Sequence, residues 1–508
     1  MEGLGTVYTS MTMNSHHLER KRTMESDRVY AINNSYRLIN DSTKCVLYRV
    51  DDFFNSVDNI TILKSYEAVV LAMFDGHRPL KDIYSDCRYI FPITDEVNFV
   101  DTIIASLEKR TEDRILVAAE DLDASGIQTL DPEAYLISSD MENSCPMDLR
   151  LSFPLSVNFN VSTQCPFSCK YCYHPLDYVP PTLTVSRIQT LAEELKSAGC
   201  ESIMLTGGDP FCRKDIIDIM KAFHDAGLKY SISTKSILTN EQIDRMVDEC
   251  KLDKIQFSLD SKDIDTLSFL IGCNSSYLER FENMVTYLQE YGVEIRIKCV
   301  LTAYNYQGMY DFLEYAHVKL KSGNIQVVQY GRSGTRHDDN LFPSQEQLDI
   351  ASAELSRFRK DYPECTVVGG NFGCSYREPL SDKEKFEDPF FSKRSICNAG
   401  RFSMTILPNG EITVCEQLPY RPEYIIGSIA DQSLHDCWNS PSMKKWLSPP
   451  PRDTYKETSP CRVCSDDKYE TCHKIYSRCL RFIWETTRDT DDPDINCPES
   501  DFERFRIT

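Results

Sequence analysis

Three cysteines in one short segment have a spacing suited to metal chemistry. Cys165, Cys169 and Cys172 follow the pattern C-x-x-x-C-x-x-C. Three thiolates can hold three irons of a [4Fe–4S] cluster and leave the fourth iron without a protein ligand. An iron with an open position can bind a substrate and pass it an electron. Taken alone, the same spacing also fits a zinc site or three unrelated buried thiols.

A second group of candidate residues follows the next apolar run. Gly207 and Gly208 let the backbone approach a ligand closely, and Asp209 adds a negative charge at the same place. Two later apolar runs also end in polar residues, which are Thr234, Lys235, Ser258 and Asp260.

Alternating strands and helices are expected to position these residues. The apolar runs predict six strands, at Leu155–Val161, Ser202–Leu205, Lys229–Ser233, Lys254–Leu259, Glu294–Leu301 and Asn324–Gln329. Helices are expected between them, with caps at Thr184, Thr239…Gln242 and Ser276…Glu279. Six strand–helix repeats predict a parallel sheet with right-handed crossovers. Loops that follow parallel strands of this kind gather at one face, where active sites are built.

The cysteine triad, followed by a strand and Gly-Gly-Asp-Pro, resembles the radical S-adenosylmethionine (radical SAM) superfamily. This resemblance implies an α/β fold with a partial (β/α)6 TIM barrel over residues 151–364. It also implies that S-adenosylmethionine binds the open iron of a cluster held by Cys165, Cys169 and Cys172, which are then the catalytic residues.

The same resemblance assigns contacts to the cofactor. The family motif usually carries Glu, which contacts the amino group of S-adenosylmethionine, and the shorter Asp209 is expected to accept from that ammonium. The backbone of Tyr171 is expected near the adenine. The other cofactor-binding residues implied at the strand ends are Gly207, Gly208, Thr234, Lys235, Ser258 and Asp260.

One departure from the family concerns the methionyl carboxylate of the cofactor. Many relatives pair it with an Arg after the fourth strand, but residues 269–273 read Phe-Leu-Ile-Gly-Cys. Our hypothesis is that Lys235 or Lys298, at the ends of the third and fifth strands, provides the cation.

Cysteine, proline and charge dominate from about Cys365 to the C-terminus. Residues 404–415 predict a hairpin with Asn409-Gly410 in its turn. Together with the cysteines around it, this hairpin resembles the SPASM extension of radical SAM enzymes, which binds two auxiliary [4Fe–4S] clusters. By order of position we assign an inner cluster to Cys397, Cys415 and Cys479, and an outer cluster to Cys461, Cys464, Cys472 and Cys497.

The inner set is one ligand short. Either Cys374 supplies the fourth ligand, or the site stays open and binds a substrate thiolate. For the segment from Cys461 to Cys497, a structural zinc ribbon is the alternative.

The N-terminal part is predicted to be a separate domain over residues 28–120. Two strands, Val29–Ile39 and Lys44–Val50, precede three helices, at Ser65–Phe74, from Pro79 onward and at Val97–Leu107. With the Asp75-Gly76 turn, this order resembles the peptide-binding chaperone of pyrroloquinoline-quinone biosynthesis. That domain is called the RiPP recognition element when it is fused to enzymes that modify ribosomally made peptides. A generic winged-helix-like packing module is the alternative.

Residues 1–27 are expected to be a flexible N-terminus, 121–150 a linker and 365–508 the SPASM domain. A chain of 508 residues is expected to form two to four domains. It carries 56 basic and 78 acidic residues, and a net charge of −22 argues against extensive nucleic-acid binding. No apolar run has the length of a membrane span, and no secretory signal is seen. We therefore expect a cytoplasmic protein, whose 21 cysteines favour metal sites over disulfides.

Together the three regions resemble radical SAM peptide maturases. Such an enzyme cleaves S-adenosylmethionine reductively to a 5′-deoxyadenosyl radical and installs a thioether or carbon–carbon cross-link in a precursor peptide. The leader of that peptide is expected to bind the N-terminal domain by strand addition, and an electron donor such as flavodoxin or ferredoxin is implied. The alternatives are oxidation of a residue in a folded protein, as in sulfatase-maturing relatives, a small-molecule or RNA substrate, and a non-catalytic iron–sulfur carrier or peptide chaperone.

Overall fold

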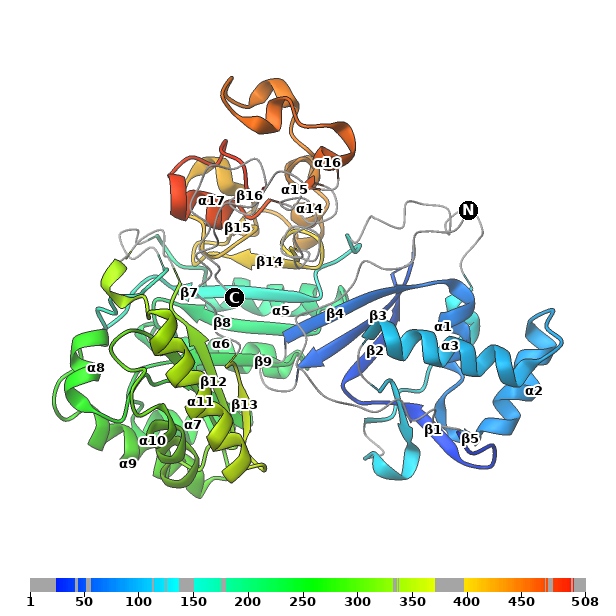
Figure 1. The fold of residues 1–508 in the computed structure, drawn as a ribbon, viewed down its shortest axis with the longest axis horizontal. Coiled ribbons are helices and arrows are strands. Elements are labelled where there is room, and N and C mark those ends of the chain that lie inside the picture. Colours follow the sequence, from blue (N-terminus) through cyan, green and yellow to red (C-terminus); the bar gives the residue numbers. More distant parts are fainter. Residues whose placement is uncertain are drawn as a thin grey trace. The chain divides into compact units, whose positions relative to one another are not determined.

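The computed structural model describes residues 24–41, 44–51, 56–111, 114–123, 126–136, 150–174, 180–331, 336, 338–370, 397–470, 472–473, 478–494 and 497. The chain divides into two compact units, and the division falls between Ser152 and Phe153. Each unit is shown in Figure 1, coloured along the sequence. The finer domain boundaries expected from the sequence stay predictions.

The N-terminal unit holds two antiparallel sheets of three strands each, with the strand orders β5-β1-β6 and β2-β3-β4. Its strands are β1 (Val29–Ile32), β2 (Tyr36–Asn40), β3 (Cys45–Asp51), β4 (Ser56–Leu63), β5 (Asp75–Pro79) and β6 (Leu116–Ala118). Its helices are α1 (Ser65–Ala72), α2 (Leu80–Ile90) and α3 (Glu96–Thr111). The three helices were predicted from the sequence, whereas β4 to β6 were not.

The prediction of one strand over Val29–Ile39 is wrong, because a turn divides it. The side chain of Asn33 accepts from the backbone N–H of Ser35 at 3.0 Å, and the Asn33 carbonyl accepts from Tyr36 N at 2.8 Å. Asn side chains commonly stabilise turns in this way. The prediction that Asp75-Gly76 ends the first helix is also wrong, because α1 ends at Ala72 and Asp75 begins β5.

The second unit is built on a ten-stranded sheet with the order β13-β12-β11-β10-β9-β8-β7-β14-β15-β16. Six parallel strands form its centre, which are β7 (Ser156–Ser162), β8 (Ser202–Gly207), β9 (Tyr230–Thr234), β10 (Lys254–Ser258), β11 (Glu294–Leu301) and β12 (Asn324–Gln329). The six predicted strands are therefore confirmed, as is the open partial (β/α)6 barrel. A short strand, β13 (Thr366–Val368), adds to β12 in parallel.

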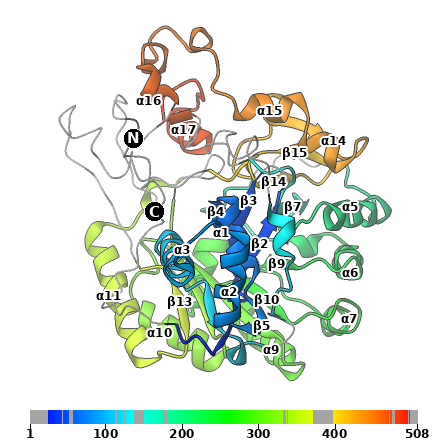
Figure 2. The same ribbon diagram turned by 90° about the vertical axis from the view of Figure 1, so that its right-hand side faces the viewer.

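The helices between these strands cover the outer face of the sheet. They are α5 (Val185–Ser197), α6 (Ile216–Asp225), α7 (Asn240–Cys250), α8 (Ile264–Ile271), α9 (Tyr277–Glu290), α10 (Met309–Glu314) and α11 (Gln345–Asp361). Figure 2 shows α5, α6 and α7 following one another along the barrel. On β11, Ile295 and Ile297 belong to the apolar core shared with these helices. Because side chains alternate along a strand, Arg296 and Lys298 lie on the opposite, inner face. That inner face is therefore polar.

Side-chain caps fix where two of these helices begin. The Thr184 hydroxyl accepts from Arg187 N at 3.2 Å, and Thr239 and Gln242 form the predicted capping box. The capping box predicted for Ser276 and Glu279 is absent, because the Ser276 hydroxyl donates to the Asn274 side chain at 3.0 Å and caps nothing.

The C-terminal part joins the barrel through one strand of the sheet and through contacts with α5, where the Arg187 guanidinium donates to the Ile429 carbonyl at 2.7 Å. The predicted hairpin is present as β14 (Ser403–Ile406) and β15 (Glu411–Thr413), and β14 pairs in parallel with β7. The remaining elements are β16 (Ile425–Ser428), α14 (Leu434–Trp438), α15 (Pro441–Leu447), α16 (Asp466–Glu470) and α17 (Leu480–Thr487). The hairpin therefore extends the barrel sheet past its first strand (Figure 1).

A close backbone approach marks the ends of β7 and β8. Gly208 N donates to the Ser162 carbonyl at 2.7 Å, and Asp209 N donates to the Gln164 carbonyl at 2.8 Å. Gly207 has φ of +138°, and a Cβ there would lie 2.1 Å from the Ser162 carbonyl oxygen. Only glycine fits this position.

Gly207→Ala is expected to destabilise the fold by roughly 2–4 kcal/mol, because it combines a strained φ with a backbone clash. The matched control is Gly292→Ala, where φ is +74° but nothing lies within 4 Å of the added Cβ. The control should cost only about 1–2 kcal/mol. Urea unfolding followed by circular dichroism measures both, and equal losses would contradict a role for the close approach.

Candidate active site at the mouth of the barrel

The cysteine loop follows β7 directly and is held by the end of α8. Ser168 N donates to the Ile271 carbonyl at 3.0 Å, and Lys170 N donates to the Leu270 carbonyl at 2.9 Å. The Arg336 guanidinium donates to the Cys169 carbonyl at 3.1 Å. These contacts fix the loop at the C-terminal end of the barrel strands, where the sequence placed it.

The three thiols of this loop are largely enclosed. Burial raises the pKa of Cys165 to about 12 and that of Cys169 to about 11, and it also raises the pKa of Cys172. The three are near enough that the charges of Cys169 and Cys172 contribute to the raised pKa of Cys165. Buried thiols clustered in this way become stable thiolates when a metal takes the place of their protons. They therefore fit an iron–sulfur cluster.

In the described part of the chain, no three His, Cys, Asp or Glu side chains converge tightly enough to bind one metal ion. The ligands of a four-iron cluster each bind a different iron, so they lie further apart than the ligands of a single ion. The spread of the three thiols is thus compatible with the predicted cluster.

Asp209 is only 3% exposed and ties two strand ends together. Its carboxylate accepts from the Thr234 hydroxyl at 2.8 Å, from Lys235 N at 3.0 Å and from Phe211 N at 3.0 Å. Donors of the protein itself therefore occupy most of this carboxylate, which links the end of β8 to the end of β9.

Asp260 forms the second buried carboxylate, just after β10. It accepts a short hydrogen bond from the Tyr171 hydroxyl and another from Val300 N at 2.8 Å. The Lys235 ammonium lies 3.7 Å from the same carboxylate and 5.6 Å from the centre of the Tyr171 ring. The structure thus brings together three of the predicted cofactor residues beside the cysteine loop.

The sequence predicts Lys298 at the end of the fifth strand, but the structure places it within β11. It stands opposite Ser258 of β10 in the sheet register, three residues before β11 ends. Burial lowers the pKa of Lys298, and the charge of Glu416 opposes that shift. Lys298 therefore faces the inside of the barrel at the register level of Lys235, because Thr234 stands opposite Phe257 and Lys298 stands opposite Ser258.

Two residues at the mouth were missed by the sequence analysis. The Tyr173 hydroxyl donates to the Glu416 carboxylate at 3.3 Å. These residues are 243 positions apart, so spacing gave no sign of the contact. Each directly follows a predicted cluster ligand, Cys172 and Cys415, and that position was the one available signal.

The C-terminal cysteines fall into two groups. Burial raises the pKa of Cys415 to about 12, and the charge of Cys397 raises it further. The charges of Cys397 and Cys415 also contribute to the raised pKa of Cys479. The charge of Cys472 likewise contributes to the raised pKa of Cys461 and of Cys464. Cys497 N donates to the Asp494 carbonyl at 2.8 Å, and Asp494 in turn contributes to the raised pKa of Cys461.

The charges of Cys397, Cys415 and Cys479 influence one another, as do those of Cys461, Cys464 and Cys472, whereas Asp494 acts on both Cys461 and Cys479. The assignment of metal ligands stays a prediction, and Cys374, the proposed fourth inner ligand, lies outside the described residues.

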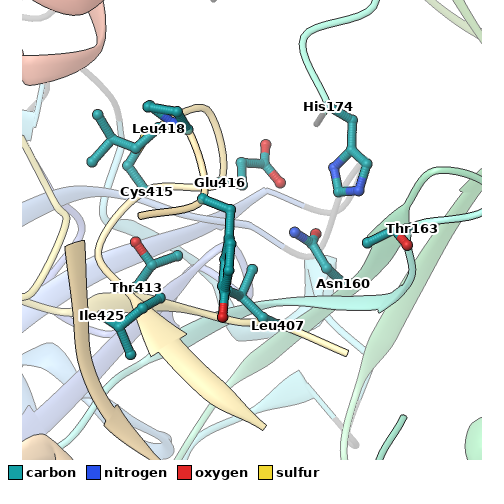
Figure 3. A pocket seen from close by; sticks show the side chains of 11 residues that line it. Asn160, Thr163, His174, Leu407, Thr413, Cys415, Glu416, Leu418 and Ile425 are labelled. Atoms are coloured by element: carbon teal, nitrogen blue, oxygen red, sulfur yellow. The ribbon is translucent and has the colours of Figure 1, made fainter. Parts of the chain in front are cut away.

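A small pocket is lined by residues from the end of β7, from the segments that follow it and from the hairpin (Figure 3). Asn160 and His174 line it from the barrel side, and Thr413 and Glu416 from the hairpin side. Burial lowers the pKa of His174 to about 4, so its ring is neutral at neutral pH. The His174 Nε2 and Asn160 Oδ1 atoms have no protein partner among the described residues. The pocket thus offers unsatisfied polar atoms next to Cys415.

Comparisons with known proteins agree with this arrangement. Residues 159–316 match the Radical SAM superfamily, and residues 397–465 match the SPASM iron–sulfur cluster-binding domain. The PqqA peptide cyclase of Granulibacter bethesdensis is 23% identical over 348 residues, which cover 67% of this chain and 86% of that protein. The PqqA peptide cyclase of Bradyrhizobium diazoefficiens is 25% identical over 320 residues, which cover 61% of this chain and 78% of that protein.

Solved structures share the fold. Streptococcus suis SuiB bound to S-adenosylmethionine has a TM-score of 0.58 at 16% identity, over 92% of this chain and 99% of that chain. SuiB bound to precursor peptide SuiA has a TM-score of 0.56 at 15% identity, over 92% and 100% of the two chains. Among the described residues, no helix has the length and apolarity needed to cross a bilayer.

The cofactors that follow from the two matched domains are S-adenosylmethionine, a [4Fe–4S] cluster and auxiliary iron–sulfur clusters. The thiol groups at the mouth and in the C-terminal part lie within or beside the matched segments. On the fold, the site and these matches together, the chain is a radical SAM protein with a SPASM domain.

Proposed function

We propose that this protein is a radical SAM peptide maturase. It cleaves S-adenosylmethionine reductively to a 5′-deoxyadenosyl radical and installs a thioether or carbon–carbon cross-link in a ribosomally made precursor peptide. The observation that carries this proposal is the group of three largely enclosed thiols beside the glycine-rich turn after β8. The relatives support a peptide substrate, since they are named PqqA peptide cyclases and SuiB was crystallised with a precursor peptide.

The cluster and S-adenosylmethionine supply the electron transfer and the radical when they are bound. The chain contributes binding and orientation. Cys165, Cys169 and Cys172 hold the cluster, and Gly208 keeps the turn open, because a Cβ there would lie 2.3 Å from the Gln164 carbonyl oxygen. The polar inner face of the barrel orients the peptide and offers it hydrogen bonds in place of water.

Asp209 has room for one more partner. A carboxylate has about four acceptor positions, and three donors of the protein reach Asp209, of which the Thr234 hydroxyl has one hydrogen to share between both oxygens. The remaining position is the one we assign to the ammonium of S-adenosylmethionine. The internal bonds then hold the carboxylate in place, which compensates for a side chain shorter than the family's Glu.

The leader peptide is proposed to add to β4 in the N-terminal unit. In the sheet β2-β3-β4, the edge of β2 is already covered, since Gln128 donates to the Tyr36 carbonyl at 2.7 Å and Tyr135 donates to the Leu38 carbonyl at 3.0 Å. Strand addition requires an edge with unpaired backbone groups. Among the described residues no strand pairs with the outer edge of β4, so this is the edge on which we propose that a peptide strand pairs.

Anaerobic protein incubated with dithionite, S-adenosylmethionine and a precursor peptide is expected to form 5′-deoxyadenosine and a peptide two hydrogens lighter. The triple variant Cys165→Ala/Cys169→Ala/Cys172→Ala should form neither, because the cluster has no ligands. Mass spectrometry measures both products. An iron-loaded wild-type protein that forms no 5′-deoxyadenosine would indicate a carrier or chaperone, and turnover by the triple variant would end the proposal.

Iron and sulfide contents test the number of clusters. Three [4Fe–4S] clusters require about twelve irons per chain, and the triple variant should retain about eight. Cys250→Ala is the control, because Cys250 is buried in the helix-facing core and should not change the iron content. Zinc in place of the C-terminal irons would instead support a structural zinc ribbon.

Lys235→Met is expected to weaken S-adenosylmethionine binding about tenfold, a loss of about 1.4 kcal/mol, if Lys235 pairs with the methionyl carboxylate. Lys298→Met tests the other candidate in the same way. Lys262→Met, which removes an exposed ion pair with Asp311, should leave the affinity unchanged. Equilibrium binding to the reconstituted protein decides between them, and unchanged affinity in both barrel variants would refute the hypothesis.

A further inference from the structure

One carboxylate of the hairpin reaches into the mouth of the barrel. Glu416 directly follows Cys415, and Figure 3 shows both on the segment that comes after β15. The Tyr173 hydroxyl donates to Glu416 Oε1 at 3.3 Å, and Tyr173 directly follows Cys172. This single hydrogen bond therefore joins the neighbours of two predicted ligands that belong to different clusters.

The charges of two residues on other elements act on the Glu416 carboxylate. Burial raises the pKa of Glu416, while Lys298 on β11, the Tyr173 hydroxyl and Arg481 on α17 lower it. Arg481 lies two residues after Cys479 and is itself fixed by an ion pair with Glu485 at 2.9 Å. Glu416 therefore directly follows one predicted ligand, Cys415, and interacts with residues close to two others, Cys172 and Cys479.

The hairpin does not need Glu416 in order to fold. Its first strand pairs with β7 over four residues, from Ser403 opposite Ser156 to Ile406 opposite Phe159. The turn is closed by Gly410 N, which donates to the Leu407 carbonyl at 2.9 Å. A hydrogen bond between segments 243 residues apart, beside two predicted cluster sites, points to a role in the site.

We propose that Glu416 is a positioning residue that holds the inner auxiliary iron–sulfur site at a fixed distance from the cluster of the cysteine loop. The inference rests on the proposed function, which supplies both clusters. It adds that the Tyr173–Glu416 hydrogen bond sets the coupling between the two clusters.

This coupling matters for the electron balance of a cross-link. When a substrate carbon radical bonds to an X–H group of the peptide, one proton and one electron are released. The proton passes to solvent, and the electron passes to an oxidised auxiliary [4Fe–4S] cluster, which is reduced by one electron and is later reoxidised by an external carrier. A cluster that moves away from the mouth accepts this electron more slowly, so that radicals are lost before the bond forms.

The test compares Tyr173→Phe, which removes one hydroxyl, and Glu416→Gln, which keeps an acceptor and removes the charge. The control is Tyr315→Phe, which removes a similar Tyr–Glu hydrogen bond of 2.9 Å to Glu282 between α9 and the segment after α10. Iron content is measured first, and all three variants are expected to match the wild type.

The first readout is electron paramagnetic resonance of the dithionite-reduced protein without substrate. In Tyr173→Phe and Glu416→Gln, the relaxation enhancement that one reduced cluster exerts on the other should be weaker, whereas Tyr315→Phe should behave as the wild type. The second readout is the ratio of cross-linked peptide to 5′-deoxyadenosine, which should fall several-fold in the first two variants only.

Unchanged relaxation together with an unchanged product ratio in both mouth variants would overturn the inference. Failure of the proposed function gives a different result, because the wild type would then form no 5′-deoxyadenosine with any peptide. In that case the relaxation measurement still decides whether Glu416 couples the two sites.

Discussion

The mouth of this barrel depends on two buried carboxylates. A carboxylate removed from water must be hydrogen-bonded or paired, since an isolated buried charge is very costly. Asp209 meets this requirement by binding the turn after β9, and Asp260 meets it by binding Tyr171, Lys235 and the backbone of β11. The ends of β8, β9, β10 and β11 are thereby fixed relative to one another and to the cysteine loop. Satisfying these charges gives the site its geometry.

The mouth of the barrel carries positive side chains, although the chain as a whole is strongly negative. The protein has a net charge of −22. Nevertheless the Lys235 charge favours the thiolate form of Cys169 and Cys172, and the Arg336 charge favours the thiolate form of Cys172. In each thiol burial raises the pKa, and these cations oppose the shift. A cluster with three thiolate ligands brings negative charge into an enclosed place, and the carboxylate of the cofactor, although balanced within the molecule by its ammonium and sulfonium, also needs a cation beside it. Buried cations that are already in place lower the cost of both.

Much of this fold was predictable, because its strands have the simplest possible signal. Apolar runs of strand length recur along the second unit, and all six central strands were predicted from those runs. The cysteine groups were predicted from spacing and order, and their assignment as ligands stays a prediction. The contacts among side chains at the mouth were not. The Tyr173–Glu416 pair joins distant segments, and the hydroxyl of Ser276 bonds to Asn274 in place of a helix end. Such choices depend on which neighbours the fold supplies, and no local pattern encodes them.

Strand β7 connects the cysteine loop with the hairpin that leads to the inner auxiliary site. β7 leads directly into the loop of Cys165, and on its other side it pairs with β14, whose hairpin leads to Cys415. Parallel pairing fixes Ser403 opposite Ser156 and carries both chains toward the same end of the sheet. β15 then runs antiparallel to β14, so the chain turns back before it reaches Cys415. The register of β14 on β7 fixes where this turn lies, because a shift of one residue would turn the apolar face of β14 outward. The contact of Glu416 with Tyr173 then joins the segment after β15 to the segment after the cysteine loop.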